Sequence, residues 1–153
     1  MTHMSTTYHV YRTGVQVKQT VSEKTFTDTG LTPHTTYQYQ VSAQNEAGES
    51  PKSEPISVTT AYSAVASVAL DKETLSITMG QTATLVAKVQ PATADPNVTW
   101  ASSDASSVTV NGSGKVTPVK VGTAILTISS KADSTKQATC TVTVTEAPPP
   151  SQG

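Results

Sequence analysis

The stretch LTPHTTYQYQV, residues 31–41, decides how the fold is interpreted, because its aromatic and apolar residues fall at every second position. Tyr37, Tyr39 and Val41 alternate with polar residues, and Ala43 continues the same phase. Side chains two positions apart lie on one face of a β-strand. The pattern therefore predicts a strand whose inner face, with Tyr37, Val41 and Ala43, lines a core.

Further strands are expected on both sides of this stretch. Residues 8–18 alternate around a Thr13-Gly14 pair, which predicts two strands joined by a tight hairpin, because glycine tolerates positive φ in such turns. A short strand is expected at 24–31. A last strand of this half is expected within SEPISVTTAY, residues 53–62.

Residues 8–60 resemble the second half of a fibronectin type III domain. The resemblance rests on Leu31, Pro33 and Tyr37 and on the SVTT ending. It implies that Tyr37 forms a tyrosine corner, which buries the ring and returns its hydroxyl to the backbone of the preceding loop. The first two strands of such a domain, with their usual tryptophan, have no counterpart. The resemblance therefore implies an N-terminally incomplete sandwich.

An incomplete sandwich leaves an apolar face and unpaired backbone groups uncovered, and both are costly. Two outcomes are expected. Either a neighbouring chain or an upstream segment supplies the missing strands, by strand donation or in a homo-oligomer, or the region is poorly ordered.

The second half of the chain repeats a rhythm of short strands and turns. Turn signals recur at roughly 8–12 residues, a spacing typical of an antiparallel sandwich. Thr, Ser and Val dominate the composition, and β-branched residues favour strands over helices. Strands are expected at 65–70, 74–78, 82–90, 97–102, 107–110, 114–118, 122–130 and 137–145.

Residues 65–145 resemble the bacterial immunoglobulin-like group 2 family. VTWASSD at 98–104 and VTVNGSGKVTPVKVGTAILTI at 108–128 carry the resemblance. It implies that Trp100 points into the core. Gly114 and Gly122 suit turn positions that need a permissive φ.

The predicted fold class is therefore all-β, with two immunoglobulin-like β-sandwiches in tandem, the first N-terminally incomplete. The expected plan is a tail or cloning remnant at 1–7, a partial fibronectin type III-like domain at 8–61, a linker at 62–64, a bacterial Ig-like group 2 domain at 65–146 and a disordered Pro-rich tail at 147–153.

Charge and cysteine content exclude several classes of partner. The 153 residues carry a net charge of −1, with 14% charged residues, which gives no basic surface for nucleic acid or an anionic membrane. No apolar run is long enough for a membrane-spanning helix, and the N-terminus lacks the pattern of a secretory signal. The single cysteine, Cys140, excludes an intrachain disulfide. It lies in phase with Val142 and Val144, which predicts a buried structural thiol.

The sequence shows no catalytic constellation. A hydrolase needs a nucleophile, a base and an orienting group together, yet the only histidines are His3, His9 and His34. His9 alternates with Tyr8 and Val10 and is expected to face solvent, and His34 is expected in a turn. We therefore expect no enzyme activity, no metal site and no cofactor.

Three tyrosines are the candidate glycan-contact residues. Stacking on sugar rings needs exposed aromatic side chains, and aromatic residues make up only 5% of the chain. Trp100 is expected in the core, which leaves Tyr11, Tyr39 and Tyr62 as candidates for contact with a host-surface carbohydrate.

The two resemblances imply a non-catalytic module. The first hypothesis is a surface-displayed module of a bacteriophage virion, an appendage or decoration of the tail tube or capsid. There it would adhere weakly to host-surface polymer or reinforce the particle by contact with other virion subunits. The alternative is a spacer or adhesion module of a bacterial cell-surface protein or a secreted polysaccharide hydrolase. The expected locations are accordingly the virion surface or, in the alternative, the bacterial surface or medium.

Overall fold

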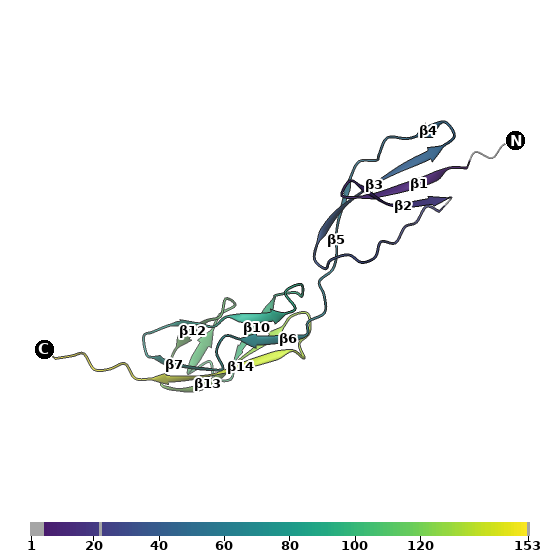
Figure 1. Ribbon diagram of the computed structural model, residues 1–153. Helices are drawn as coiled ribbons and strands as arrows, with labels where there is room; N and C mark the ends of the chain where they lie inside the picture. Colours follow the sequence, from purple (N-terminus) through teal and green to yellow (C-terminus); the bar gives the residue numbers. More distant parts are fainter. Residues whose placement is uncertain (1–4, 22, 153) are drawn as a thin grey trace. The chain divides into compact units, whose positions relative to one another are not determined.

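The computed structural model describes residues 5–21 and 23–152 (Figure 1). Within these residues every regular element is a β-strand and no helix occurs, so the all-β prediction is confirmed. In particular, no helix there is long and apolar enough to cross a membrane. The chain divides into two compact units, unit 1 (residues 1–62) and unit 2 (residues 63–153), which are described separately.

Unit 1 is built on one antiparallel sheet. β1 and β2 form the predicted hairpin, whose turn places Thr13 at φ 50° and Gly14 at φ 83°. β3 pairs with β1 along one edge and with β4 and β5 along the other. The strands are β1 (Thr7–Arg12), β2 (Val15–Val21), β3 (Thr36–Asn45), β4 (Gly48–Glu49) and β5 (Ile56–Thr59).

One face of this sheet is apolar. Val10 pairs with Val41, Tyr39 pairs with Ile56, and Tyr37 with Val58, so their side chains share that face. Val41 is nevertheless 47% exposed, and the prediction that it lies in a core is wrong. The alternation placed Val41 on the correct face, but no second sheet covers that face within the described residues.

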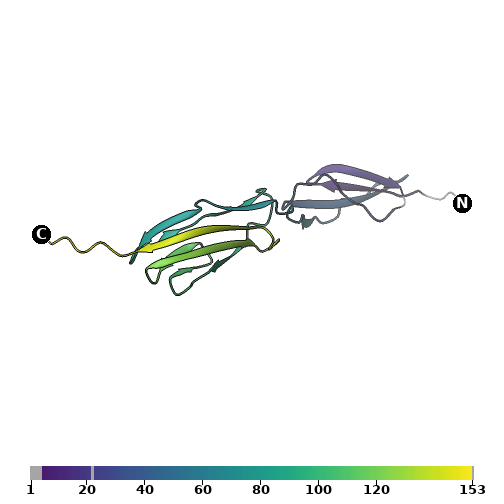
Figure 2. The same cartoon turned by 90° about the horizontal axis from the view of Figure 1, so that it is seen from below.

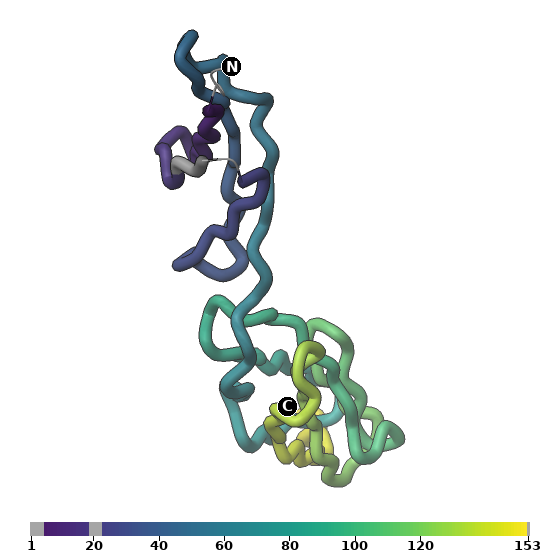
Figure 3. The backbone as a smooth tube through the Cα atoms, turned by 90° about the vertical axis from the view of Figure 1, so that its right-hand side faces the viewer, coloured from purple at the N-terminus to yellow at the C-terminus, as the bar shows by residue number. Residues whose placement is uncertain are grey.

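Residues 23–28 lie beside the apolar face without forming a strand. In Figure 3 the backbone of residues 23–30 continues to the turn before β3. The strand predicted at 24–31 is therefore wrong: among the described residues this segment has no ladder partner. It ends at the tyrosine corner, where the backbone N–H of Thr32 donates to the Tyr37 hydroxyl at 3.0 Å. Tyr37 itself is half-buried.

Unit 2 is a closed sandwich. Its main sheet has the order β10-β13-β14-β7, with β7 parallel to β14 and the other pairs antiparallel. Sheets β11-β12-β8 and β6-β9 complete it. Figure 2 shows β14 (yellow) and β13 (green) side by side along the unit. The strands are β6 (Ser67–Leu70), β7 (Thr74–Thr78), β8 (Ala83–Thr84), β9 (Ala87–Gln90), β10 (Val98–Ser102), β11 (Val108–Val110), β12 (Lys115–Pro118), β13 (Gly122–Ser130) and β14 (Gln137–Thr145).

The strand predicted at 82–90 is two strands. β8 pairs with β12 and β9 pairs with β6, so the chain changes sheet between them. Leu85 lies at this change and is 1% exposed. A continuous strand could not serve both sheets, and burial of Leu85 accompanies the break.

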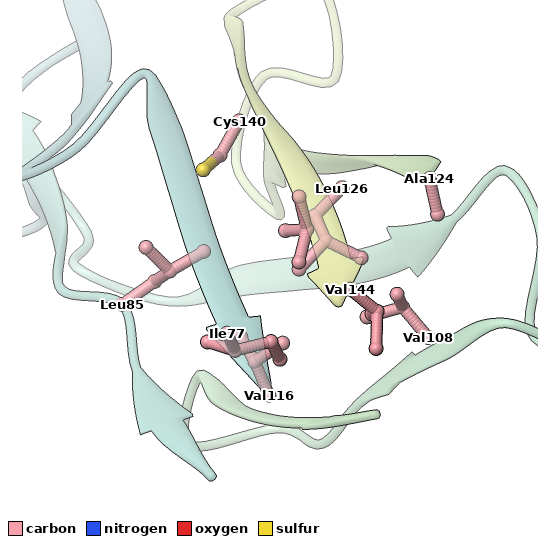
Figure 4. Packing of buried hydrophobic residues seen from close by; sticks show 9 residues of the cluster. Ile77, Leu85, Val108, Val116, Ala124, Leu126, Cys140 and Val144 are labelled. Atoms are coloured by element: carbon pink, nitrogen blue, oxygen red, sulfur yellow. The ribbon is translucent and has the colours of Figure 1, made fainter. Parts of the chain in front are cut away.

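The core of unit 2 comes from strict alternation on β13 and β14. Leu126 and Ile128 on β13 and Cys140 and Val142 on β14 are all 0% exposed. Figure 4 shows Leu126 and Cys140 among the buried residues of one cluster. Full burial of a leucine, isoleucine or valine side chain contributes roughly 1.5–3 kcal/mol to the free energy of unfolding. The buried residues of unit 2 form two clusters, one that includes Leu126 and Val142 and one that includes Val68 and Ile128. Trp100 is half-buried and packs against both clusters.

Candidate functional site

Tyr11 is not the exposed aromatic residue that the sequence suggested. It is only 9% exposed, its hydroxyl donates to Glu49 Oε1 at 2.7 Å, and Lys52 Nζ lies 3.8 Å from its ring centroid. A ring covered by a lysine and held by a carboxylate has no free face for a sugar. The prediction of Tyr11 as a surface glycan contact is wrong.

Tyr39 is also held by neighbours. Its hydroxyl donates to Asp28 Oδ2 at 2.7 Å, and Arg12 Nη1 contacts both oxygens of the same carboxylate at 3.0 and 2.9 Å. The Tyr39 hydroxyl, and after it the Arg12 guanidinium, hold the pKa of Asp28 below its usual value. Tyr39 is therefore a half-buried anchor for the segment that crosses the sheet.

Tyr62 keeps an exposed surface, at 40%. Its ring stacks on His34, with centroids 3.9 Å apart and planes 10° apart. Of the three candidate tyrosines it is the most exposed, and one face of its ring is already taken by His34.

His9 is buried, contrary to the expectation that it faces solvent. It is 5% exposed, on the sheet face opposite the apolar one, together with Tyr11 and Ser42. Its Nδ1 lies 3.1 Å from Glu49 Oε1, and because a carboxylate only accepts, Nδ1 carries the proton. Its Nε2 is buried and finds no partner among the described residues.

These contacts define the Glu49 cluster: His9, Tyr11, Ser42 and Glu49. Hydroxyl donation from Ser42, then from Tyr11, and the contact with His9 lower the pKa of Glu49 to about 2. No pattern in the sequence indicates the cluster, because Glu49 lies 40 positions from His9. The cluster connects the edge at β4 to β1 and β3.

An open recess in unit 1 lies on its apolar face. This open groove has a volume of about 730 Å³. Val41 and Val58, each 47% exposed, and Ile56, 62% exposed, form its floor. Its full lining is Tyr8, Val10, Glu23, Lys24, Thr25, Phe26, Thr27, Asp28, Leu31, Tyr39, Val41, Ile56 and Val58.

Acidic side chains in unit 2 build turns. Asp104 accepts from the backbone N–H of Ser106 and from the Ser107 hydroxyl. The Ser106 hydroxyl, and next the Ser107 hydroxyl, hold the pKa of Asp104 below its usual value. Across the described residues no three His, Cys, Asp or Glu side chains come together as metal ligands would. Cys140 is fully buried, and burial raises the pKa of its thiol.

The two units match two families of modules. The profile of the bacterial Ig-like domain (group 2) matches residues 64–142, which is more than half of the chain. The chain belongs to the bacterial Ig-like domain (group 2) family. The fibronectin type III domain profile matches residues 3–59. The fold is therefore two Ig-like domains in tandem, of the kind that the sequence predicted.

Curated relatives of this group 2 Ig-like chain include bacterial glycosidases. It is 53% identical over 72 residues to lacto-N-biosidase of Bifidobacterium bifidum, covering 47% of this chain and 6% of that protein. It is 43% identical over 72 residues to 3-O-alpha-D-galactosyl-alpha-L-arabinofuranosidase of Bifidobacterium longum subsp. longum, covering 46% and 6%. The chain thus spans a small fraction of each relative.

A solved structure supports the fold. The crystal structure of the S-layer protein rSbsC superposes with a TM-score of 0.50 at 20% identity, covering 93% of this chain and 20% of that one. These matches are to modules of a surface-layer protein and of glycosidases. The structural match bears on the fold alone. The sequence matches to segments of glycosidases favour the hydrolase part of the alternative over the bacteriophage virion hypothesis.

Proposed function

We propose that the chain is a non-catalytic spacer module of a bacterial cell-surface protein or of a secreted glycoside hydrolase. One geometric observation carries the proposal: within each unit the chain enters at one end and leaves at the opposite end. Such a module holds the domains before and after it apart.

In unit 1 the path follows β3 from end to end. β1 begins at Thr7, beside Gln44, and β5 ends at Thr59, beside Thr36. Thr36 and Gln44 lie near the two ends of the ten-residue strand β3. At about 3.3 Å per residue, this strand spans roughly 33 Å.

In unit 2 the path follows β14. The chain enters at Ser63, which bridges Ala94 in the loop before β10. β14 starts at that end, where Gln137 pairs with Ser129, and finishes at Thr145. Its nine residues span about 30 Å. In Figure 2 the C-terminal segment leaves unit 2 from the far end of the yellow strand.

The similarity to glycosidases supports the proposal because the matched segment is small compared with those proteins. The matched segment makes up 6% of lacto-N-biosidase, so it is a small part of a much larger protein. Group 2 Ig-like and fibronectin type III domains are typically non-catalytic modules. An adhesive role receives less support, because the one exposed aromatic candidate, Tyr62, is stacked on His34.

A replacement experiment in the parent protein tests the proposal. Residues 5–145 are exchanged for an unrelated β-sandwich pair of similar length whose termini lie at opposite ends and which binds no glycan. A second variant receives a flexible Gly/Ser linker with the same number of residues, which behaves as a random coil. Surface display or activity on an insoluble polymer is then measured.

If the chain is a spacer, the unrelated sandwich should restore surface display or activity on the polymer, and the flexible linker should not. Loss of function with the unrelated sandwich, together with binding of the isolated chain to the polymer, would show adhesion instead. Hydrolysis by the isolated chain would overturn the non-catalytic assignment.

A further inference from the structure

We propose that unit 2 bears tension: it resists being pulled apart at its two ends through the parallel pair β7–β14, and Asp71 fixes the strand crossing that carries the load to this pair. The inference rests on the proposed spacer function and adds that the spacer works under load. The resistance lies within the fold of unit 2 and requires no second molecule.

The two ends of unit 2 are attached to neighbouring strands that run in the same direction. The entering chain passes through β6 into β7, and the leaving chain follows β14. Thr74 lies beside Thr141, and Thr78 lies beside Thr145. Tension on the entering chain draws β7 toward its Thr74 end, whereas tension on the leaving chain draws β14 toward its Thr145 end. The two strands are therefore made to slide past each other in opposite directions.

Sliding loads the whole ladder between β7 and β14 at once. The hydrogen bonds of a parallel ladder cross from strand to strand at even spacing, so a pull along the strands strains them together. The ladder joins five residue pairs. At its two ends Thr141 N–H donates to the Glu73 carbonyl and Met79 N–H donates to the Thr145 carbonyl, each at 2.9 Å. A pull that separated the strands from one end would instead break these bonds one after another.

Both strands of the pair are also anchored in the core. On its other edge β14 pairs with β13 over eight residue pairs. Its inward side chains Cys140, Val142 and Val144 are at most 2% exposed, and Ile77 on β7 is 7% exposed. Sliding β7 along β14 therefore also draws apolar side chains out of the core, which adds to the resistance.

Asp71 holds the crossing that leads the load to β7. The chain pairs with β9 through β6 and with β14 through β7, so it changes partner between Leu70 and Thr74. At this point Asp71 N–H donates to the Val86 carbonyl at 3.0 Å, and Asp71 Oδ1 accepts from Val86 N–H at 2.7 Å. One residue thus binds the backbone of Val86 through both its N–H and its carbonyl. The Val86 N–H, and next the Lys72 ammonium, hold the pKa of Asp71 below its usual value.

The order of elements along the chain sets the order in which they are loaded. Tension from Ser63 reaches the four residue pairs of β6–β9 and the Asp71–Val86 contact before it reaches β7. Release of β6 lengthens the chain only slightly, because this segment is already extended. Rupture of β7–β14 then releases roughly 70 residues, or about 24 nm of extended chain. Unit 2 should therefore yield in a short early step and a long main step.

The first arm of the test compares two directions of pulling in single-molecule force measurements on the 153-residue chain. In one, the handles are attached at the two ends of the chain, and the main step of unit 2 is recognised by its length. In the other, they are attached at Gln81→Cys and Glu146→Cys, which follow β7 and β14 at the same end and are exposed. We expect the end-to-end force of the main step to be at least about twofold larger at equal loading rate, because five residue pairs share the load.

The second arm tests Asp71 against a matched aspartate. Asp71→Ala should lower the force of the early step by about a quarter or more and leave the force of the main step unchanged. Asp133→Ala is the control, because Asp133 likewise accepts a backbone N–H, from Thr135 at 3.0 Å, in a turn outside the loaded path. It should change neither force. Asp71→Asn, which keeps an acceptor oxygen, should retain most of the early force.

The outcomes separate this inference from the spacer function. Equal forces of the main step in the two pulling directions would overturn the load-bearing role, even where an unrelated sandwich restores function in the parent protein and so supports the spacer. An early step unchanged by Asp71→Ala, or early and main forces that fall together in this variant, would overturn the role of Asp71.

Discussion

Glu49 shows how one residue can organise a sheet face. Its carboxylate accepts from Tyr11 and Ser42 and lies against His9, three side chains that come from two different strands. Because these donors favour the charged form, the pKa of Glu49 falls from 4.5 to about 2. The stability of unit 1 therefore depends on whether Glu49 is ionised.

The linkage predicts a defined pH window. A carboxyl whose pKa is lower in the folded state stabilises the fold above its unfolded pKa, and the stabilisation is lost as pH falls toward the folded value. Unit 1 should therefore lose stability between about pH 5 and pH 2, and Glu49→Gln should flatten this loss. Thermal unfolding followed by tyrosine circular dichroism measures it. Glu46→Gln, at an exposed loop position, is the control and should keep the wild-type slope. A Glu49→Gln profile parallel to wild type would contradict the linkage.

Gly114 is a position where the backbone conformation and the neighbouring atoms leave no room for a side chain. It has φ 82°, and a Cβ there would meet the Leu85 carbonyl oxygen and the Trp100 ring. Gly114→Ala should destabilise unit 2 by at least about 2 kcal/mol, because strained backbone and the clash add. Gly112→Ala, where a Cβ meets nothing within 4 Å, should change stability by less than about 0.5 kcal/mol. Urea unfolding followed by Trp100 fluorescence compares the two. Equal stabilities would show that the turn relaxes freely.

At the scale of elements, buried residues alternate along β13 with residues that are half-buried or exposed. Leu126→Ala should cost roughly 2–5 kcal/mol, because it opens a cavity in a fully buried cluster. Ile125→Ala, next along the strand and 46% exposed, should cost clearly less. Urea midpoints at unchanged slope give both values. If Ile125→Ala lowered the free energy of unfolding as much as Leu126→Ala, the assignment of Leu126 to the buried face of β13 would be contradicted.

The strands of unit 2 could be predicted from alternation because its second layer lies within the same sequence. The strands predicted at 122–130 and 137–145 match β13 and β14. In unit 1 alternation located β3, but burial depends on what lies above the sheet. Val41 is exposed for lack of a covering strand, whereas Tyr11 is buried because Glu49 and Lys52 cover it. Such contacts across distant positions leave no periodic signal.

At the scale of the molecule, the spacer role depends on the path of the chain through each unit. A spacer must keep its two ends apart, and unit 2 does so along β14. Its buried core and its ladder between β13 and β14 hold this strand straight from the end near Asn97 to the end near Thr78.

A distance measured across unit 2 is the sharpest test of the spacer role. Spin labels are attached at Ala92→Cys, beside the point where the chain enters, and at Glu146→Cys, just beyond β14. Native Cys140 is fully buried and stays unlabelled. A control pair joins Ala92→Cys to Ser134→Cys, in the loop at the same end of the unit. We expect a narrow distribution near 30 Å for the first pair, roughly the length of β14, and a shorter distance for the control. A broad distribution, or a first distance no longer than the control, would contradict the spacer role.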